Sequence, residues 1–129
     1  MTSKKNNQNS ISLLGKKIYP IGYGCGIGNY TKNYDYRLIK NIIKQAYHIG
    51  YNFFDTAPVY GKGLSEKYLG SALNLEKKDK CIIATKISPE MLSAKNINKS
   101  VLKSKKNLGV DIIDLVQLHW PNPNIDIKE

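Results

Sequence analysis

The sequence lacks several features that would place it in a specialised class of protein. It has only two cysteines, Cys25 and Cys81, far apart and without C-x-x-C or metal-ligand spacing, so neither a disulfide framework nor a metal site is indicated. No apolar run approaches the roughly 18 residues of a membrane span, and the N-terminus lacks the apolar stretch of a signal peptide. We therefore expect a soluble, cytoplasmic protein with no membrane partner.

Arginine is almost absent, since Arg37 is the only one, yet lysine gives the chain a formal net charge of +10. Clustered basic residues would indicate a nucleic-acid partner. Here the lysines occur as scattered pairs, for example Lys16-Lys17 and Lys77-Lys78, in a chain also rich in Asn and Ile. We interpret the charge as a compositional bias of solvated surfaces and predict no nucleic-acid partner, although part of it could attract an anionic cofactor.

The length of 129 residues suits one domain, because a chain of this size buries roughly two-thirds of its unfolded surface. The first ten residues are polar and unpatterned, which predicts a disordered tail over residues 1–15 and a single domain over residues 16–129. Short apolar runs predict strands, and helical spacing of apolar residues predicts helices. The predicted strands are 18–24, 51–55, 81–86 and 112–118, and the predicted helices are 36–49, 65–73 and 96–108.

Strands that are apolar on both faces and alternate with helices indicate a parallel sheet covered by helices. The strand starts recur about every thirty residues, which suits either a (β/α)8 barrel or an open doubly wound sheet. The glycines after the first strand fail the G-x-G-x-x-G register, since counting from Gly22 or Gly24 puts Ile27 or Asn29 at the third glycine position. Periodicity alone leaves both folds open.

Polar residues capable of proton chemistry follow three of the predicted strands: Asp55, Tyr60, Lys86 and His119. Each alone has a structural explanation, as a turn cap, a loop aromatic, a surface lysine or a satisfied histidine. Because parallel strands end at one rim, all four are expected to face the same end of the sheet.

These residues stand in segments that resemble the aldo-keto reductases. The matching segments are FFDTAPVYGKGLSEKYLGSAL (53–73), CIIATK (81–86) and LGVDIIDLVQLHWP (108–121), in a similar order and spacing to those of the family. The resemblance covers nearly the whole chain from Ile18 onward. It implies the N-terminal half of a (β/α)8 TIM barrel, with four parallel strands and helices on the outer face.

The resemblance also implies a function, the NAD(P)H-dependent reduction of an aldehyde or ketone, with NADP(H) favoured over NAD(H). In the family a tyrosine, here Tyr60, protonates the carbonyl oxygen. The pKa of a free phenol is near 10, so a neighbouring cation is needed to make its proton available near neutrality. By the family pattern Lys86 is that cation, held by Asp55, and His119 hydrogen-bonds the substrate carbonyl. Trp120 would line the substrate pocket, and Gly24, Cys25, Gly26 and Asp55 would lie beside the cofactor.

A complete barrel has eight strands in about 250 residues, so this sequence accounts for half of one. We weigh three hypotheses: a fragment of a longer gene, an inactive remnant, or a half that pairs with a second chain to close the barrel. The alternative function is a non-catalytic, reductase-like interaction module. On the last helix, Ile97, Val101, Leu102 and Leu108 are expected on or near one face, and Lys105 replaces an apolar residue of the family pattern.

Overall fold

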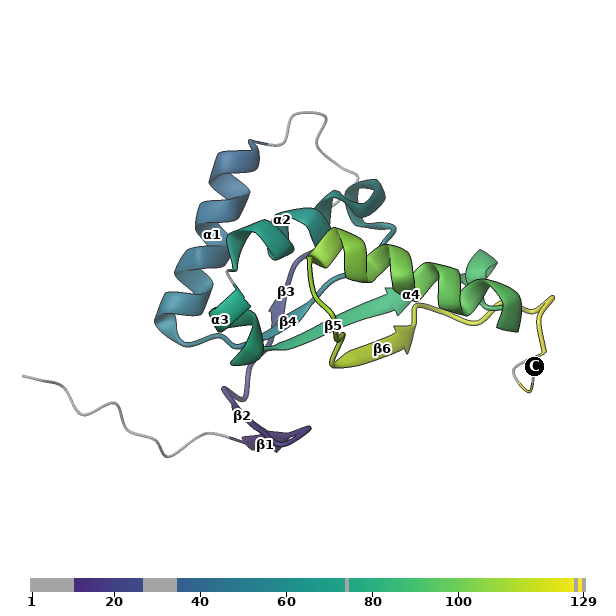
Figure 1. The fold of residues 1–129 in the computed structure, drawn as a ribbon, viewed down its shortest axis with the longest axis horizontal. Coiled ribbons are helices and arrows are strands. Elements are labelled where there is room, and N and C mark those ends of the chain that lie inside the picture. The colour runs from purple at the N-terminus through teal and green to yellow at the C-terminus, as the bar shows by residue number, and fades with distance from the viewer. Residues whose placement is uncertain (1–10, 27–34, 74, 127, 129) are drawn as a thin grey trace, which may run out of the picture.

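The four strands of the main sheet run parallel and lie in sequence order, as expected for the first half of an α/β barrel. A computed structural model describes residues 11–26, 35–73, 75–126 and 128 (Figure 1). The strands of this sheet are β3 (Tyr23–Gly24), β4 (Phe53–Asp55), β5 (Ile82–Ile87) and β6 (Leu115–Leu118). Each pairs in parallel with the next, which confirms the predicted fold class.

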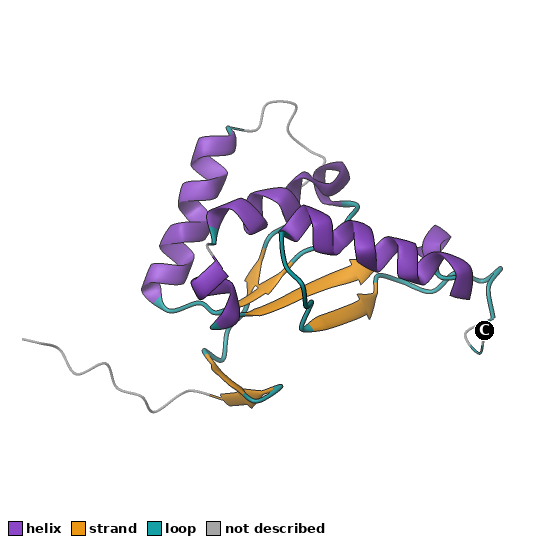
Figure 2. Ribbon diagram, viewed as in Figure 1, coloured by secondary structure: helices purple, strands orange, loops and turns teal. Residues whose placement is uncertain are grey.

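The helices lie on one face of this sheet (Figure 2). The principal helices are α1 (Tyr36–Ile49), α2 (Leu64–Ala72), α3 (Leu75–Asp79) and α4 (Ala94–Leu108), and the 3-10 turns are η1 (Tyr60–Gly63) and η2 (Pro89–Met91). The bounds of α1 match the prediction because the sequence places a capping residue at each end of the helix. The Asp35 side chain accepts hydrogen bonds from the backbone N–H groups of Arg37 and Leu38, and Gly50 takes the left-handed conformation with φ of 115°.

The first predicted strand is wrong in its extent. Within 18–24, only Tyr23 and Gly24 belong to the parallel sheet, and Ile18 instead ends β2 (Lys16–Ile18). Pro20 has no N–H to donate to a strand ladder. A side chain at Gly22 would stand 2.6 Å from the Phe53 ring, so the backbone passes too close to that ring for any larger residue.

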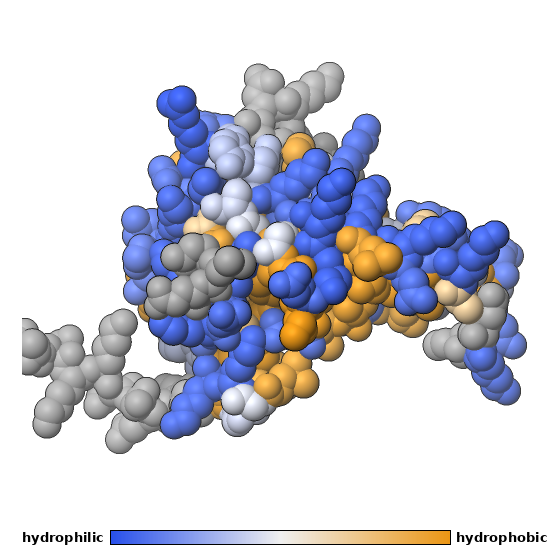
Figure 3. Space-filling view, in the orientation of Figure 1, coloured by the Kyte–Doolittle hydropathy of each residue, from blue (hydrophilic) through white to orange (hydrophobic). Residues whose placement is uncertain are grey.

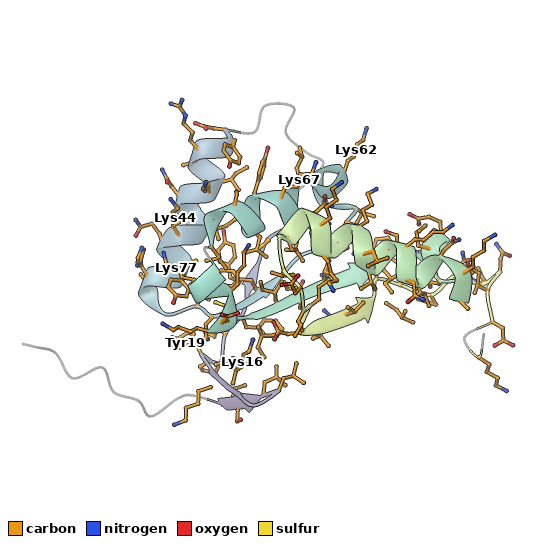
Figure 4. The ribbon with its side chains drawn as sticks, in the orientation of Figure 1. Lys16, Tyr19, Lys44, Lys62, Lys67 and Lys77 are labelled. Carbon is orange, nitrogen blue, oxygen red and sulfur yellow. The ribbon has the colours of Figure 1, made fainter. Side chains whose placement is uncertain are left out.

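A short hairpin precedes the sheet and was not predicted. Strand β1 (Ile11–Leu13) pairs antiparallel with β2, so residues 11–15, assigned to the tail from sequence, form a strand and a turn. Residues 1–10 lie outside the described residues. The Lys16 ammonium ties the hairpin to the sheet, because it donates to Asp114 at 2.6 Å and to the Cys81 carbonyl at 2.6 Å (Figure 4).

The last helix and strand also differ from their predicted patterns. Leu102 was expected near the buried face of α4 but is 63% exposed, whereas Ser100, Ser104 and Leu108 are buried at four-residue spacing. The serines hold the buried face because their small side chains allow close helix packing. Strand β6 starts at Leu115 rather than at 112, because the Asp114 side chain accepts the Ile83 N–H at 2.9 Å and occupies the position of a ladder bond.

The core lies between the sheet and the helices. It includes Phe54, Ile83, Leu69, Ile43 and Leu108, all nearly inaccessible to solvent. Hydrophobic surface is exposed around β6, as Figure 3 shows, where Val116 and Leu118 are 37% and 48% accessible. Within the described part of the chain, no helix combines the length and apolar character that a membrane crossing requires.

Candidate active site

The strand registers bring three polar side chains to the same end of the sheet. Asp55 closes β4 and pairs in register with Ala84 of β5, so Lys86, two residues further, points to the same face as Asp55. Gln117 of β6 is the direct register partner of Lys86. Because the strands are parallel, these groups meet at the carboxyl end of the sheet, where barrel active sites lie.

Lys86 and Asp55 form a close ion pair at this end. The Lys86 Nζ donates to Asp55 Oδ2 at 2.6 Å and to the Thr56 carbonyl at 2.8 Å. The ammonium side chain is 13% exposed and the carboxylate side chain 31%. A half-buried pair with a further hydrogen bond holds the ammonium more firmly than a surface salt bridge would.

Tyr60 lies next to this ion pair. It begins η1, where Gly61 and Lys62 have φ of 58° and 55°, so the chain turns sharply after the tyrosine. The Lys86 Nζ is 5.1 Å from the centre of the Tyr60 ring, which is cation–π distance. No hydrogen bond joins the Tyr60 hydroxyl to the Lys86 amine among the described residues, so the ammonium contacts the ring face in this state.

His119 lies next to Tyr60 and completes this group of polar side chains. Its ring centre is 5.6 Å from that of Tyr60, in an edge-on arrangement, and 3.9 Å from that of Trp120. Its Nδ1 is sealed from solvent and has no hydrogen-bond partner within the described chain. The pKa of His119 is lowered from its usual 6.5, first by burial and then by the Lys86 charge, with Asp55 and Glu90 opposing. The imidazole is therefore neutral at pH 7.

The glycine turn after β3 reaches the same site. A side chain at Gly24 would meet no atom within 4 Å, and one at Gly26 would lie 3.8 Å from the Tyr60 ring. Cys25 between them is 4% exposed and packs into the core. Its backbone N–H donates to the Asp55 carbonyl at 2.7 Å, and burial raises the pKa of its thiol to about 12. Any ligand at this turn would therefore meet glycine backbone rather than a reactive thiol.

Buried hydroxyl groups fix this turn to its neighbours. The Ser65 hydroxyl donates to the Cys25 carbonyl at 2.5 Å and lies 2.8 Å from the Thr56 hydroxyl, with both hydroxyl residues fully buried. Glu66, also fully buried, accepts from Thr85 at 2.8 Å and from Asn107 at 2.8 Å. These bonds tie α2 to the segments that follow β3 and β4, to β5 and to α4.

The structure thus brings together Asp55, Tyr60, Lys86 and His119, with Trp120 beside the histidine and 54% exposed. Sequence reasoning missed Gln117, whose Nε2 donates to Asp55 Oδ1 at 3.1 Å. It also missed the supporting roles of Thr56, Ser65 and Glu66. The signal that could have found Gln117 is its polarity inside the apolar run IIDLVQL, two residues before His119.

The fold is half of a parallel α/β barrel, and ionisable side chains meet at the carboxyl ends of its strands, where the active sites of barrel enzymes lie. The Aldo/keto reductase family profile matches residues 20–129, and the chain belongs to this family. It is 38% identical to the aldo-keto reductase YhdN of Bacillus subtilis over 93% of this chain and 40% of that protein. The chain spans less than half the length of the first curated relatives it matches.

Solved structures show the same relationship. A thermostable aldo-keto reductase in complex with the inhibitor epalrestat superposes with a TM-score of 0.80 at 32% identity, over 93% of this chain and 46% of that one. An aldo-keto reductase of Bombyx mori, solved in complex with NADP, gives a TM-score of 0.71 at 25% identity over 92% of this chain and 40% of that one. Both extend well beyond the region shared with this chain.

Proposed function

We propose that this chain supplies the proton-transfer groups for the NAD(P)H-dependent reduction of an aldehyde or ketone to an alcohol. The observation that carries the proposal is the convergence of Asp55, Lys86, Tyr60 and His119 at one mouth of the sheet, with the Lys86 ammonium against the Tyr60 ring. A reduced nicotinamide, when bound, supplies a hydride to the carbonyl carbon. The protein must then deliver a proton to the carbonyl oxygen.

Tyr60 is the proton donor in this proposal. As the hydride adds to carbon, the C=O π bond becomes an O–H bond and the phenol becomes a phenolate. The Lys86 ammonium stabilises that phenolate, which requires its Nζ to move from the ring face toward the phenol oxygen when substrate binds. Such tightening is common, since catalytic hydrogen bonds are often loose without ligand. Asp55 holds the lysine in place through their 2.6 Å ion pair.

His119 orients the carbonyl as a neutral hydrogen-bond donor. Its Nδ1 is buried and unpaired within the described chain, and a buried N–H is costlier to leave unpaired than a bare acceptor. We therefore assign the proton to Nε2, which can donate to the substrate oxygen. Trp120, half exposed and against His119, would pack on the substrate.

The turn after β3 fits a flat nicotinamide ring. Open space at Gly24, and the short separation of Gly26 from the Tyr60 ring, leave backbone accessible beside the proton donor. We propose that Gly24, Gly26 and the adjoining backbone of Cys25 line the cofactor, with Asp55 at its edge. The aldo-keto reductase of Bombyx mori solved in complex with NADP supports NADP(H) as the cofactor, with NAD(H) as the second choice. The two buried free cysteines support a cytoplasmic location.

Replacing Tyr60 by Phe tests this proposal. NADPH consumption with a panel of simple aldehydes and ketones should fall by roughly 10²- to 10⁴-fold, because the proposed proton donor is lost. Tyr19→Phe is the matched control, since Tyr19 is 45% exposed and packs against Tyr51 instead. Undiminished turnover by Tyr60→Phe would contradict the assignment. A folded chain whose Trp120 fluorescence shows no NADPH binding would favour the non-catalytic module instead.

A further inference from the structure

The carboxylate of Asp55 is held through both of its oxygens. Oδ2 accepts from Lys86, and Oδ1 accepts from the side-chain amide of Gln117 at 3.1 Å. Asp55 is 31% exposed, so without the second bond its carboxylate could turn toward solvent and draw the lysine with it. The amide is neutral, so it fixes the carboxylate without competing with Lys86 for charge.

The sheet geometry makes this contact specific to a long amide. Gln117 lies on β6 and Asp55 on β4, with Lys86 on the strand between them. Neighbouring strands are about 4.8 Å apart, so the two side chains and the hydrogen bond between them must together span nearly two strand spacings. Asparagine is one methylene shorter and would not reach.

We infer that Gln117 is a positioning residue for the proposed carbonyl reduction, acting through Asp55 to keep the Lys86 ammonium beside Tyr60. The inference rests on the proposed function. Gln117 adds a residue from a third strand to the site. Strands β4, β5 and β6 then each contribute one side chain to a hydrogen-bonded series, in which the Asp55 carboxylate accepts from both the Gln117 amide and the Lys86 ammonium. The Thr56 carbonyl supplies a second anchor for Lys86, so losing Gln117 should displace the ammonium without releasing it.

Gln117→Met removes the amide and keeps a side chain of similar length. We expect kcat for carbonyl reduction to fall about tenfold, since a hydrogen bond to the charged Asp55 of the Asp55–Lys86 pair is lost. The pH profile of kcat should shift as well. Gln45→Met is the matched control, because Gln45 is exposed on α1. Gln117→Asn should behave like the methionine variant and preserves polarity if that variant folds poorly.

A readout without turnover separates this inference from the proposed function. The ¹H–¹⁵N signal of the Lys86 ammonium reports how well it is held, because its protons exchange faster when a partner loosens. We expect that signal to broaden in Gln117→Met and Gln117→Asn but not in Gln45→Met, whether or not the wild type reduces carbonyls. An unchanged ammonium signal in both Gln117 variants would overturn the inference. An inactive wild type that still shows the broadening would instead count against the proposed function alone.

Discussion

Burial and the neighbouring Lys86 charge both lower the pKa of His119. Both disfavour the imidazolium, so the pKa of His119 lies below its usual 6.5 in the folded chain. The unfolded chain therefore takes up this proton first as the pH falls. The stability that depends on neutral His119 is complete above about pH 6.5, the ordinary histidine value, and is lost as pH falls toward and below the folded pKa.

We predict that thermal melting between pH 8 and pH 5 will show this dependence. The wild type should lose more of its melting temperature over that range than His119→Gln, because the variant has no imidazole to protonate. His48→Gln is the control, since His48 is exposed on α1 and is the only other histidine. Identical pH dependence in the wild type and His119→Gln would show that the imidazole is not held neutral by its surroundings.

The sequence indicates which polar residues lie at the ends of strands. Because parallel strands end at one rim, the convergence of Asp55, Lys86 and His119 could be predicted from it. Their catalytic roles stay predictions. The position of Tyr60 depends on left-handed backbone at Gly61 and Lys62, which a glycine suggests but a lysine does not. The Gln117 contact depends on register and sheet curvature across three strands, and no local pattern encodes it.

Among the elements, helices α2 and α4 touch backbone to backbone at one point. A side chain at Gly70 of α2 would stand 2.4 Å from the carbonyl oxygen of Leu108, the last residue of α4. Glycine is costly in a helix, by about 1 kcal/mol relative to alanine, so its presence here reflects this crossing rather than helix propensity. The crossing holds α2, which carries Ser65 and Glu66, against α4.

Gly70→Ala should therefore destabilise the protein by about 1–3 kcal/mol in urea unfolding, despite the better helix propensity of alanine, because overpacking must push α4 away. Lys67→Ala on the exposed face of the same helix is the control and should change stability by less than about 0.5 kcal/mol. A gain in stability for Gly70→Ala would mean that the two helices are not in contact there.

The elements best predicted from sequence are those with explicit ends. Helix α1 lies between Asp35 and Gly50, and α4 ends before Gly109, whose φ is 61°. Strands are less well predicted, because a run such as 18–24 contains apolar residues but its pairing depends on Pro20 and on the distant Phe53 ring. The β1–β2 hairpin is anchored by Lys16 to Asp114, almost a hundred positions away, which local patterning cannot show.

Across the whole molecule, apolar hollows lie beside the first strand of the sheet and at the end of the last. Beside β3 a hollow of about 240 Å³ is lined by Ile39, Ile42 and Ile43 of α1 with the glycine turn, and at the end of β6 one of about 110 Å³ is lined partly by Ile97 and Leu118. The lysines are spread around the helices, as Lys44, Lys62 and Lys67 illustrate in Figure 4. We propose that the sheet edges, rather than the charged surface, are where a second chain would dock.

Pairing with a second chain to close the barrel remains a hypothesis, and size-exclusion chromatography with light scattering tests it. If two copies pair, the mass should rise toward twice 14.5 kDa with concentration. It should rise further with salt, because each copy carries a formal charge of +10 and the two repel. A monomer whose mass is independent of both concentration and salt would exclude self-pairing.

The most direct test of the proposed carbonyl reduction is to follow the hydride itself. NADPH carrying deuterium at the transferable C4 position is incubated with the chain and an aldehyde, and the product is analysed by mass spectrometry. We predict an alcohol with one deuterium on the former carbonyl carbon, formed at least about a hundredfold more slowly by Lys86→Met. An unlabelled alcohol, or equally fast labelling by the two proteins, would contradict it.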